Sequence, residues 1–425
     1  MRVYLEAFGC AQNRGEGSQL ARELEASGHQ LLDGPVGAEA AVLVTCGVIG
    51  PTETRMVSRW RRLGEAAPRL VVTGCLVPLR TGLFDGPARA RTTFVPISEQ
   101  GSIPGLLATD GTGPMEPTGE GPTRARSLAE EVVIAQGCAS GCAYCYSRLA
   151  RGSLRSVPLG EIVSRTRAAL ARGARELRLT SLDTAAWGLD RPGGPRLPQL
   201  LRELATELGP ARARVGMMSP QSLAPIVEEH ARALGLPGVF RFAHLPVQSG
   251  SDPVLARMHR GYRVSEFRRQ VRVLRSQVPD LHLATDVIVG FPEETEDDAR
   301  ATAELLSEVG PEMVNVTRFS PRPGTPAARL PPLGPRVARR RSRELAVLRR
   351  GIARDRLERW IGRRCPGRVM EYGPRGSAVV RLGNYLPVVL ASRPPLGADL
   401  EVRIDGARST YLLGTAGELL GRERL

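Results

Sequence analysis

Cys138, Cys142 and Cys145 lie in one short stretch near the middle of the chain. The CxxxCxxC spacing lets a single loop present three thiolates, which can bind three corners of a four-iron four-sulfur (4Fe-4S) cluster and leave the fourth iron open for a ligand. Gly137 and Gly141 suit a loop that wraps a bulky inorganic group, because glycine tolerates positive φ. The alternatives are a zinc loop or a chance spacing, but zinc needs a fourth ligand and no His or Cys follows closely.

Three more cysteines belong to a predicted α/β unit that covers the first 110 residues. Strands are expected at residues 2–7, 41–44 and 70–73, with helices at roughly 16–27 and 53–65. Cys10, Cys46 and Cys75 each follow one of these strands. Because the carboxyl ends of parallel strands meet at one edge of a sheet, these thiols are expected to converge there. Taken alone, each cysteine is better explained as a small buried hydrophobic residue.

The middle and the end of the chain differ in pattern. Residues 111–127 are rich in Gly, Pro and Thr and are predicted to form a linker. Residues 128–358 alternate strands and helices in about six βα units, which predicts an α/β fold with an open or partial barrel that ends in an Arg-rich helix near 336–359. Residues 359–420 carry short alternating segments typical of a small β-barrel.

Composition narrows the class of protein. The chain has 425 residues, 42% of them hydrophobic, and seven cysteines that are widely spread, which favours reduced thiols over disulfides. No apolar stretch is as long as a membrane span and no signal peptide is recognised, so we expect a cytoplasmic protein with no membrane partner.

The net charge is +15, and no lysine occurs among the 59 basic residues. Arginine binds phosphate with two parallel hydrogen bonds and stacks on bases, which favours a nucleic-acid partner. A GC-rich genome would also explain the lack of lysine, but not the excess of positive charge. Arginines near the predicted last helix could form an RNA-binding surface or a solvated helix face: Arg336, Arg339, Arg340, Arg341, Arg343, Arg363 and Arg364.

Several motifs in the family's own domain order make the chain resemble radical S-adenosylmethionine (SAM) methylthiotransferases. They are GC with Asn at 9–13, TC at 45–46, TGC at 73–75, the CxxxCxxC loop, HLPVQSGS at 244–251, TDVIVGFP at 285–292 and RFSPRPGTPAA at 318–328. The resemblance implies an N-terminal methylthiotransferase domain (1–110), a radical SAM core (128–358) and a TRAM RNA-binding domain (359–420). Two departures are Val44, where the family usually has Asn, and Glu293, where it has Gly.

Three phrases resemble the archaeal and eukaryotic branch of this family: TCGV with PTE after it, ARG at 150–152, and RPGTPAA. That branch methylthiolates N6-threonylcarbamoyladenosine at position 37 of tRNA. Other branches act on a different tRNA base or on an aspartate of a ribosomal protein. A cluster-containing RNA-binding protein without catalytic activity is a further alternative, which two intact cysteine trios disfavour.

The resemblance also implies the cofactors and partners. Two 4Fe-4S clusters would be held by two trios, Cys138, Cys142 and Cys145 (the core trio) and Cys10, Cys46 and Cys75 (the N-terminal trio), facing one closed chamber. SAM would be used twice, to methylate sulfur and to generate a radical. The partners would be the anticodon stem-loop of tRNA and an electron donor such as a ferredoxin or a flavodoxin. Cys365 would be structural.

Seven further residues are candidates for the cofactor pocket: Tyr144, Thr180, Ser181, Asp183, His244, Gln248 and Asp286. Each has a plainer interpretation. Tyr144 could pack inward, and the group at 180–183 could cap a helix. His244 could be a core residue, and Asp286, a carboxylate in an apolar strand, needs a partner and could cap a loop.

Overall fold

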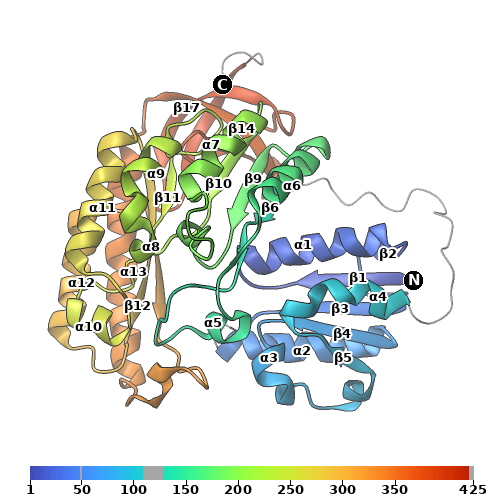
Figure 1. Cartoon of the computed structure of the whole chain (residues 1–425). Helices are drawn as coiled ribbons and strands as arrows, with labels where there is room; N and C mark the ends of the chain where they lie inside the picture. The colour runs from blue at the N-terminus through green and yellow to red at the C-terminus, as the bar shows by residue number, and fades with distance from the viewer. Residues whose placement is uncertain (48–49, 109–127, 421–425) are drawn as a thin grey trace.

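The computed structural model describes residues 1–47, 50–108 and 128–420. The predicted linker at 111–127 lies outside the described residues. Figure 1 shows three parts: an N-terminal α/β unit, a larger half-barrel with helices on its outside, and a small barrel near the C-terminus. Within the described ranges, no helix combines the length and the apolar character that crossing a membrane requires.

The N-terminal unit is a five-stranded parallel sheet with helices on both faces. Its strands run in the order β2 (Gln30–Leu32), β1 (Arg2–Ala7), β3 (Ala40–Thr45), β4 (Arg69–Gly74) and β5 (Thr92–Phe94). Helices α1 (Ala11–Ala26) and α4 (Ile103–Ala108) pack on one face, and α2 (Gly50–Ala66) packs on the other. All six residues of β3 are buried, because a central parallel strand is covered on both sides.

Helix α1 begins earlier than predicted, immediately after Cys10. Gly15 and Gly17 weaken helix propensity, but they let α1 lie close to its neighbours. A Cβ at Gly15 would stand 3.0 Å from Val133, and one at Gly17 would stand 2.6 Å from Ala7. Tertiary packing therefore outweighs the low helix propensity of these two glycines.

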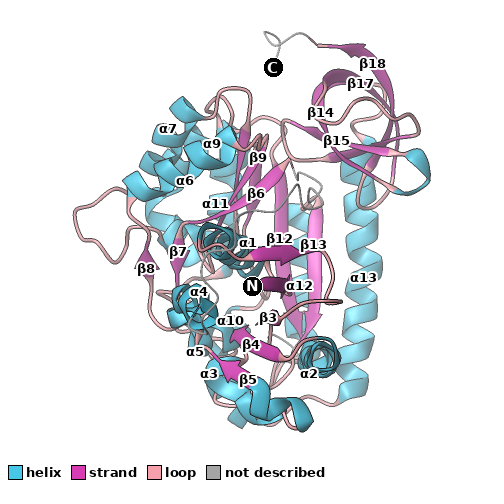
Figure 2. Cartoon of the chain, turned by 90° about the vertical axis from the view of Figure 1, so that its right-hand side faces the viewer, coloured by secondary structure: helices cyan, strands magenta, loops and turns pink. Residues whose placement is uncertain are grey.

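The half-barrel consists of six parallel strands, which confirms the predicted partial barrel. Two three-stranded sheets, β10-β9-β6 and β11-β12-β13, meet through bridges from Ala213 to Val239 and from Met217 to His244. The strands are β6 (Ala129–Val133), β9 (Glu176–Thr180), β10 (Arg212–Val215), β11 (Phe242–His244), β12 (His282–Val289) and β13 (Met313–Arg318). Outside them lie α6 (Leu159–Ala171), α7 (Leu197–Glu207), α9 (Val227–Leu234), α11 (Val264–Gln277), α12 (Glu296–Val309) and α13 (Pro335–Glu358) (Figures 1 and 2).

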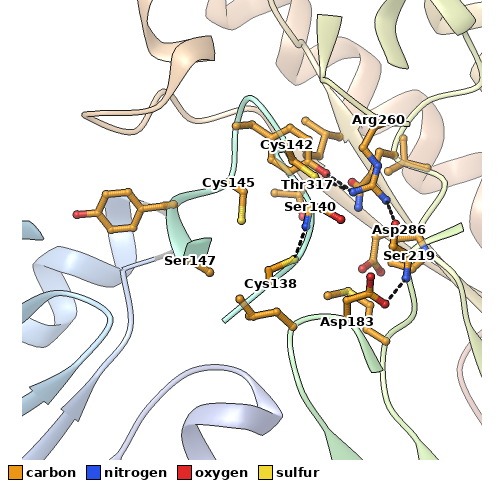
Figure 3. Close-up of a pocket in the computed structure, with 18 of the residues that line it drawn as sticks. Cys138, Ser140, Cys142, Cys145, Ser147, Asp183, Ser219, Arg260, Asp286 and Thr317 are labelled. Atoms are coloured by element: carbon orange, nitrogen blue, oxygen red, sulfur yellow. Dashed lines mark hydrogen bonds between the residues drawn. The ribbon is translucent and has the colours of Figure 1, made fainter. Parts of the chain in front are cut away.

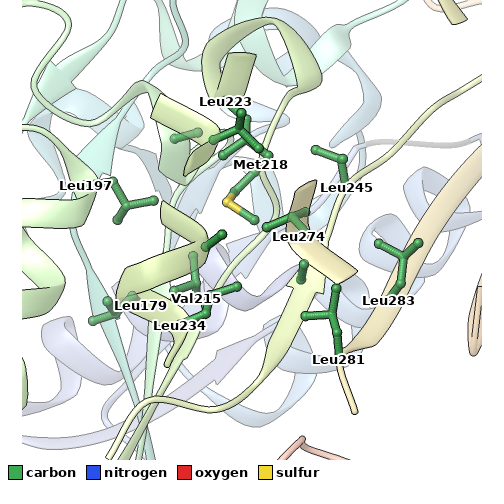
Figure 4. Packing of buried hydrophobic residues seen from close by; sticks show 14 of the residues in the cluster. Leu179, Leu197, Val215, Met218, Leu223, Leu234, Leu245, Leu274, Leu281 and Leu283 are labelled. Atoms are coloured by element: carbon green, nitrogen blue, oxygen red, sulfur yellow. The ribbon is translucent and has the colours of Figure 1, made fainter. Parts of the chain in front are cut away.

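The core of the half-barrel lies between the strands and these helices. Figure 4 shows leucines from strands and helices meeting there, including Leu179 on β9, Leu197 on α7 and Leu274 on α11, all fully buried. Burial of apolar side chains is the dominant favourable term in folding, so this core fixes the strand ends that carry the site.

The last part is a closed barrel, which matches the predicted small β-barrel. Its strand order is β14 (Arg364–Tyr372), β15 (Ala378–Leu382), β16 (Pro387–Leu390), β18 (Leu412–Leu419) and β17 (Asp399–Ala407). Tyr385, in the turn after β15, joins it to the half-barrel. The Tyr385 ring lies 5.0 Å from Phe240 and 5.1 Å from Phe242, and its hydroxyl donates to Glu176 at 2.9 Å.

Tyr385→Ala is expected to loosen this junction. The change removes the aromatic packing and leaves the buried Glu176 without one donor, so the free energy of unfolding should fall by about 3–5 kcal/mol. Urea denaturation followed by circular dichroism measures the effect. Tyr372→Ala removes a more exposed tyrosine from the same barrel and should cost under about 1 kcal/mol. Equal losses for the two variants would contradict the role of Tyr385.

Candidate active site

A cavity of about 340 Å³ opens at the carboxyl ends of the half-barrel strands. The three cysteines of the core trio line it, together with Tyr144, Asp183, Gln248 and Asp286 among the predicted residues. Figure 3 shows the cysteine loop on one side and Asp183, Ser219, Arg260 and Asp286 across from it. The size and the mixture of apolar walls with a few polar groups are typical of a small-molecule site.

The core trio sits on a loop between β7 (Ala135–Gln136) and α5 (Tyr146–Arg151). Gly137 makes the first turn possible: its φ is +67°, and a Cβ there would stand 2.0 Å from the carbonyl oxygen of Ser153. Cys138 and Cys145 then receive backbone N–H groups on sulfur, each at 3.4 Å, from Ser140 and Arg148 respectively.

Arg260 completes the surroundings of the loop. Its Nη1 donates to Cys142 Sγ at 3.0 Å, and its Nη2 donates to Ser219 at 3.4 Å. Each core sulfur therefore has at least one N–H donor, as suits a metal-bound thiolate. Burial raises the pKa of the Cys138 thiol and raises that of Cys145 to about 11, so the free loop keeps these thiols protonated.

This donor set fits an iron–sulfur cluster, because thiolates are the usual cluster ligands. Among the residues that the structure describes, no group of three or more His, Cys, Asp or Glu side chains is arranged to hold a single metal ion.

Two carboxylates form the opposite wall, each held in place. Asp183 accepts hydrogen bonds from the Ser219 backbone at 2.9 Å and from the Ser222 hydroxyl at 2.7 Å, and burial raises its pKa. Asp286 receives the Asn315 amide at 2.7 Å and contacts His244 at 2.9 Å. The partner that the sequence required for Asp286 is thus a histidine together with an amide.

The other predicted pocket residues lie at different distances from the cavity. Gln248, with φ of +67°, lines the cavity. His244 does not line it but contacts Asp286, which does. Thr180 and Ser181 are buried but do not line the cavity, and the Ser181 hydroxyl has no hydrogen-bond partner among the described atoms.

The N-terminal trio gathers at the carboxyl edge of its sheet, as the strand pattern predicted. Cys10 follows β1, Cys46 follows β3 and Cys75 follows β4, and the first two influence the third electrostatically. Gly9, with φ of +108°, lies so close that a Cβ there would stand 2.8 Å from Cys46 Sγ. Burial raises the pKa of the Cys75 thiol to about 11.

The N-terminal trio does not line the cavity of the core trio. The lining of this one cavity does not test the expected chamber between the two trios, which stays a prediction. The space next to Cys75 is filled by the side chain of Arg151, which donates to the sulfur at 3.4 Å and belongs to α5, the helix that follows the core loop. The two trios are neighbours across α5.

Other departures from expectation have local causes. Arg341 is not on an RNA-binding surface: it is buried on the inner side of α13, where it pairs with Glu294 at 2.7 Å. Val44 is fully buried in β3, and the amide of Asn13 donates to the neighbouring Thr45 carbonyl at 2.9 Å. Glu293 has φ of +61°, a conformation that glycine adopts at lower cost. Cys365 lies in β14, in the small barrel.

Arg151, Arg260, Asn315 and Arg322 were not predicted as site residues. Arg322 is buried, stacks 4.4 Å from the Tyr146 ring centroid and pairs with Glu53 of α2. Arg151 stood in the motif at 150–152 and Arg322 in the motif at 318–328, but neither motif indicated these contacts.

Comparisons with known proteins show which families the chain resembles. Residues 132–306 match the family described as Radical SAM superfamily, and residues 2–84 match the one described as Uncharacterized protein family UPF0004. A Methanothermobacter thermautotrophicus protein named "Probable threonylcarbamoyladenosine tRNA methylthiotransferase" is 37% identical over 97% of this chain and 99% of its own length. A Xenopus laevis protein named "Threonylcarbamoyladenosine tRNA methylthiotransferase" is 32% identical over 97% of this chain and 76% of its own length.

Among solved structures, the fold is similar to that of the radical S-adenosylmethionine methyltransferase TsrM from Kitasatospora setae, a structure with cobalamin and a 4Fe-4S cluster bound. The TM-score is 0.55 at 16% identity, over 77% of this chain and 76% of that one. At this identity the likeness concerns the fold alone.

Gly137→Ala is expected to disable the core loop, because the added methyl group meets the Ser153 carbonyl and φ is positive. After anaerobic reconstitution with iron and sulfide, the variant should bind about half the iron of the unaltered chain if each trio binds one cluster. Gly141→Ala is the matched control, since nothing lies within 4 Å of a Cβ at that glycine of the same loop. Full iron binding by Gly137→Ala would contradict the geometry of the loop.

Proposed function

Because the chain belongs to the family of threonylcarbamoyladenosine tRNA methylthiotransferases, we propose that it converts N6-threonylcarbamoyladenosine at position 37 of tRNA into its 2-methylthio derivative. The observation that carries the proposal is the placement of the two trios: one lines the cavity at the strand ends, and the other lies directly across α5. A methylthio transfer needs both a radical centre and a sulfur-handling centre within one protein.

The core trio would hold one 4Fe-4S cluster and the N-terminal trio another. When bound, the clusters and SAM would supply the electron, the radical and the sulfur chemistry, for which an electron donor such as a ferredoxin or a flavodoxin is the proposed partner. The chain itself binds and orients. Asp183, rigidly held by Ser219 and Ser222, can accept hydrogen bonds from the ammonium group of SAM. Tyr144, Gln248 and Asp286 form walls that exclude water.

The charge of the cavity supports a substrate that carries a carboxylate. Three arginines line the cavity. Arg260 donates hydrogen bonds to Cys142 and Ser219, and Arg322 forms an ion pair with Glu53. Arg318, exposed at the end of β13, has no acidic partner among the described residues. The threonyl group of the proposed substrate ends in a carboxylate, which an arginine can bind with two parallel hydrogen bonds. We assign that contact to Arg318.

For the anticodon stem-loop, we propose the outer face of the first half of α13. Arg336, Arg339 and Arg343 are exposed there, and none has an acidic partner in the part of the chain that the structure describes. Arg340 is largely neutralised by Glu296 and Glu344. Phosphate contacts of this kind position RNA without reading its sequence.

Cys142→Ala tests the reaction itself. The variant should lose SAM cleavage and tRNA methylthiolation, because the core trio becomes a pair, while tRNA binding should stay within about twofold since the basic face is untouched. Mass spectrometry of nucleosides from tRNA incubated with each protein measures the product. Product on a different base, on a ribosomal protein, or absent even for the unaltered reduced protein would each contradict the proposed function.

Arg318→Gln tests the recognition of the carboxylate. Loss of one charge-assisted contact should raise KM for an anticodon stem-loop bearing threonylcarbamoyladenosine about tenfold or more, with a smaller change in kcat. Arg329→Gln removes the same charge from an exposed position nearby, outside the cavity lining, and should leave KM unchanged. Equal KM values for the unaltered chain and for Arg318→Gln would refute the assignment.

A further inference from the structure

Arg151 is the last residue of α5, the helix that begins directly after Cys145. Its side chain has no exposed surface, which is rare for an arginine. From α5 it reaches into the N-terminal unit, toward α1 and the end of β4. The residue therefore connects the loop of the core trio with the surroundings of the N-terminal trio.

Every donor of the Arg151 guanidinium is used. Nε donates to Cys75 Sγ at 3.4 Å, Nη1 donates to Gln136 at 3.1 Å and to Glu16, and Nη2 donates to Glu16 at 2.8 Å and to Asn13. Guanidinium offers five N–H groups in a fixed planar fork, and here five contacts match them. A lysine, with three donors and no fork, could not serve the same set.

The acceptors are themselves fixed. The Asn13 amide donates to the carbonyls of Phe8 and Thr45, which lie at the strand ends next to the N-terminal trio. Glu16 is 4% exposed and also accepts from Gln12 and Gln136. Because all members are held, the Arg151 Nε–H has a defined direction, and that direction is the sulfur of Cys75.

A sulfur atom is an unusual endpoint for a buried arginine. A neutral thiol is a weak acceptor, whereas a metal-bound thiolate is a strong one. The contact is thus well matched only when Cys75 serves as a ligand. The core trio has an equivalent contact, since Arg260 donates to Cys142 at 3.0 Å.

Attachment of the two units to each other does not require this sulfur contact. Arg322 pairs with Glu53 of α2, and Arg22 of α1 lies 3.6 Å from Glu130 of β6. Among the residues that the structure describes, neither of these arginines donates to a cysteine sulfur. Arg151 alone among them combines attachment with a donor on a cysteine of the N-terminal trio.

We propose that Arg151 is a positioning residue for the iron–sulfur centre of the N-terminal trio: it orients Cys75, stabilises the bound cluster and raises its reduction potential by donating to a ligand sulfur. Hydrogen bonds to cluster sulfurs and nearby positive charge are known determinants of that potential. The inference rests on the proposed function, because it requires a cluster at the N-terminal trio.

The test uses the full chain with Cys138, Cys142 and Cys145 changed to Ala, so that only the N-terminal trio can bind a cluster. After anaerobic reconstitution, two properties are measured: the rate at which a chelator removes iron, and the midpoint potential by a redox titration followed by electron paramagnetic resonance. In this parent, Arg151→Gln should speed iron loss about 10–100-fold and shift the potential to more negative values. Arg151→Lys keeps the positive charge but loses the planar fork of donors. Its rate of iron loss and its midpoint potential should therefore lie between those of the parent and those of Arg151→Gln.

Arg22→Gln is the matched control, since it removes an arginine from the same interface without a recorded contact to sulfur; it should leave both properties unchanged. An equal shift in Arg22→Gln would mean that attachment of the units, and not the sulfur contact, is responsible, and would overturn the proposal. So would parent-like behaviour of Arg151→Gln, or failure of both Arg151 variants to fold when thermal unfolding of the apo chain is measured.

Failure of the proposed function gives a different result. If the parent with only the N-terminal trio takes up no cluster at all, the assignment of a centre to Cys10, Cys46 and Cys75 is wrong. If the parent binds a cluster and the Arg151 variants do not change it, the function stands and only the inference about Arg151 is lost.

Discussion

The site depends on one constraint: two parallel α/β sheets must meet with their carboxyl edges on the same side. The loops that follow parallel strands lie at that edge, and both cysteine trios belong to such loops. Buried ion pairs hold the edges together: Arg151, at the end of α5, pairs with Glu16, and Arg322, which stacks on Tyr146 at the beginning of α5, pairs with Glu53. Replacing either arginine would leave a buried carboxylate uncompensated, which typically costs about 3–5 kcal/mol. Such pairs add little net stability, but they strongly disfavour any other arrangement of the two units.

Much of this arrangement could be predicted from the sequence. Strands of β-branched and aliphatic residues followed by Gly-Cys or Thr-Cys predicted the positions of the N-terminal trio, and the CxxxCxxC spacing predicted the core trio. The βα alternation predicted the partial barrel. These signals are local. The contacts of Arg151 and Arg260 join residues far apart in the chain, so no spacing or period in the sequence could indicate them.

Arg341 shows a different kind of failure. Its position within a run of arginines suggested a charged surface, yet it shares a helix face with the buried Leu345, four residues later. A period of 3.6 residues places these side chains on the inner side. The hydrophobic period of the helix therefore indicated that Arg341 is buried, whereas the many arginines around it suggested that it is exposed. Burial was possible because Glu294 neutralises the charge.

The position of the small barrel constrains how a long RNA could bind. Tyr385 and Asn384 contact Glu176 and Asp280, which stand at the amino ends of β9 and β12, whereas the cavity lies at the carboxyl ends. The small barrel and the cavity are thus at opposite ends of the half-barrel. Helix α13 spans that distance: it has 24 residues, about 36 Å of helix, and runs along the side of the half-barrel in Figure 2.

The two ends of α13 have different surroundings. Its first turns pass Gly290, beyond the carboxyl end of β12, and Leu357 packs into the core of the small barrel. An RNA that placed a base in the cavity and a second region on the small barrel would have to follow this helix. The exposed arginines at 336, 339 and 343 stand at its cavity end, where the loop that carries the reacting base would need its phosphates neutralised. The fold thus places these exposed arginines on the helix that connects the cavity end of the half-barrel with the small barrel.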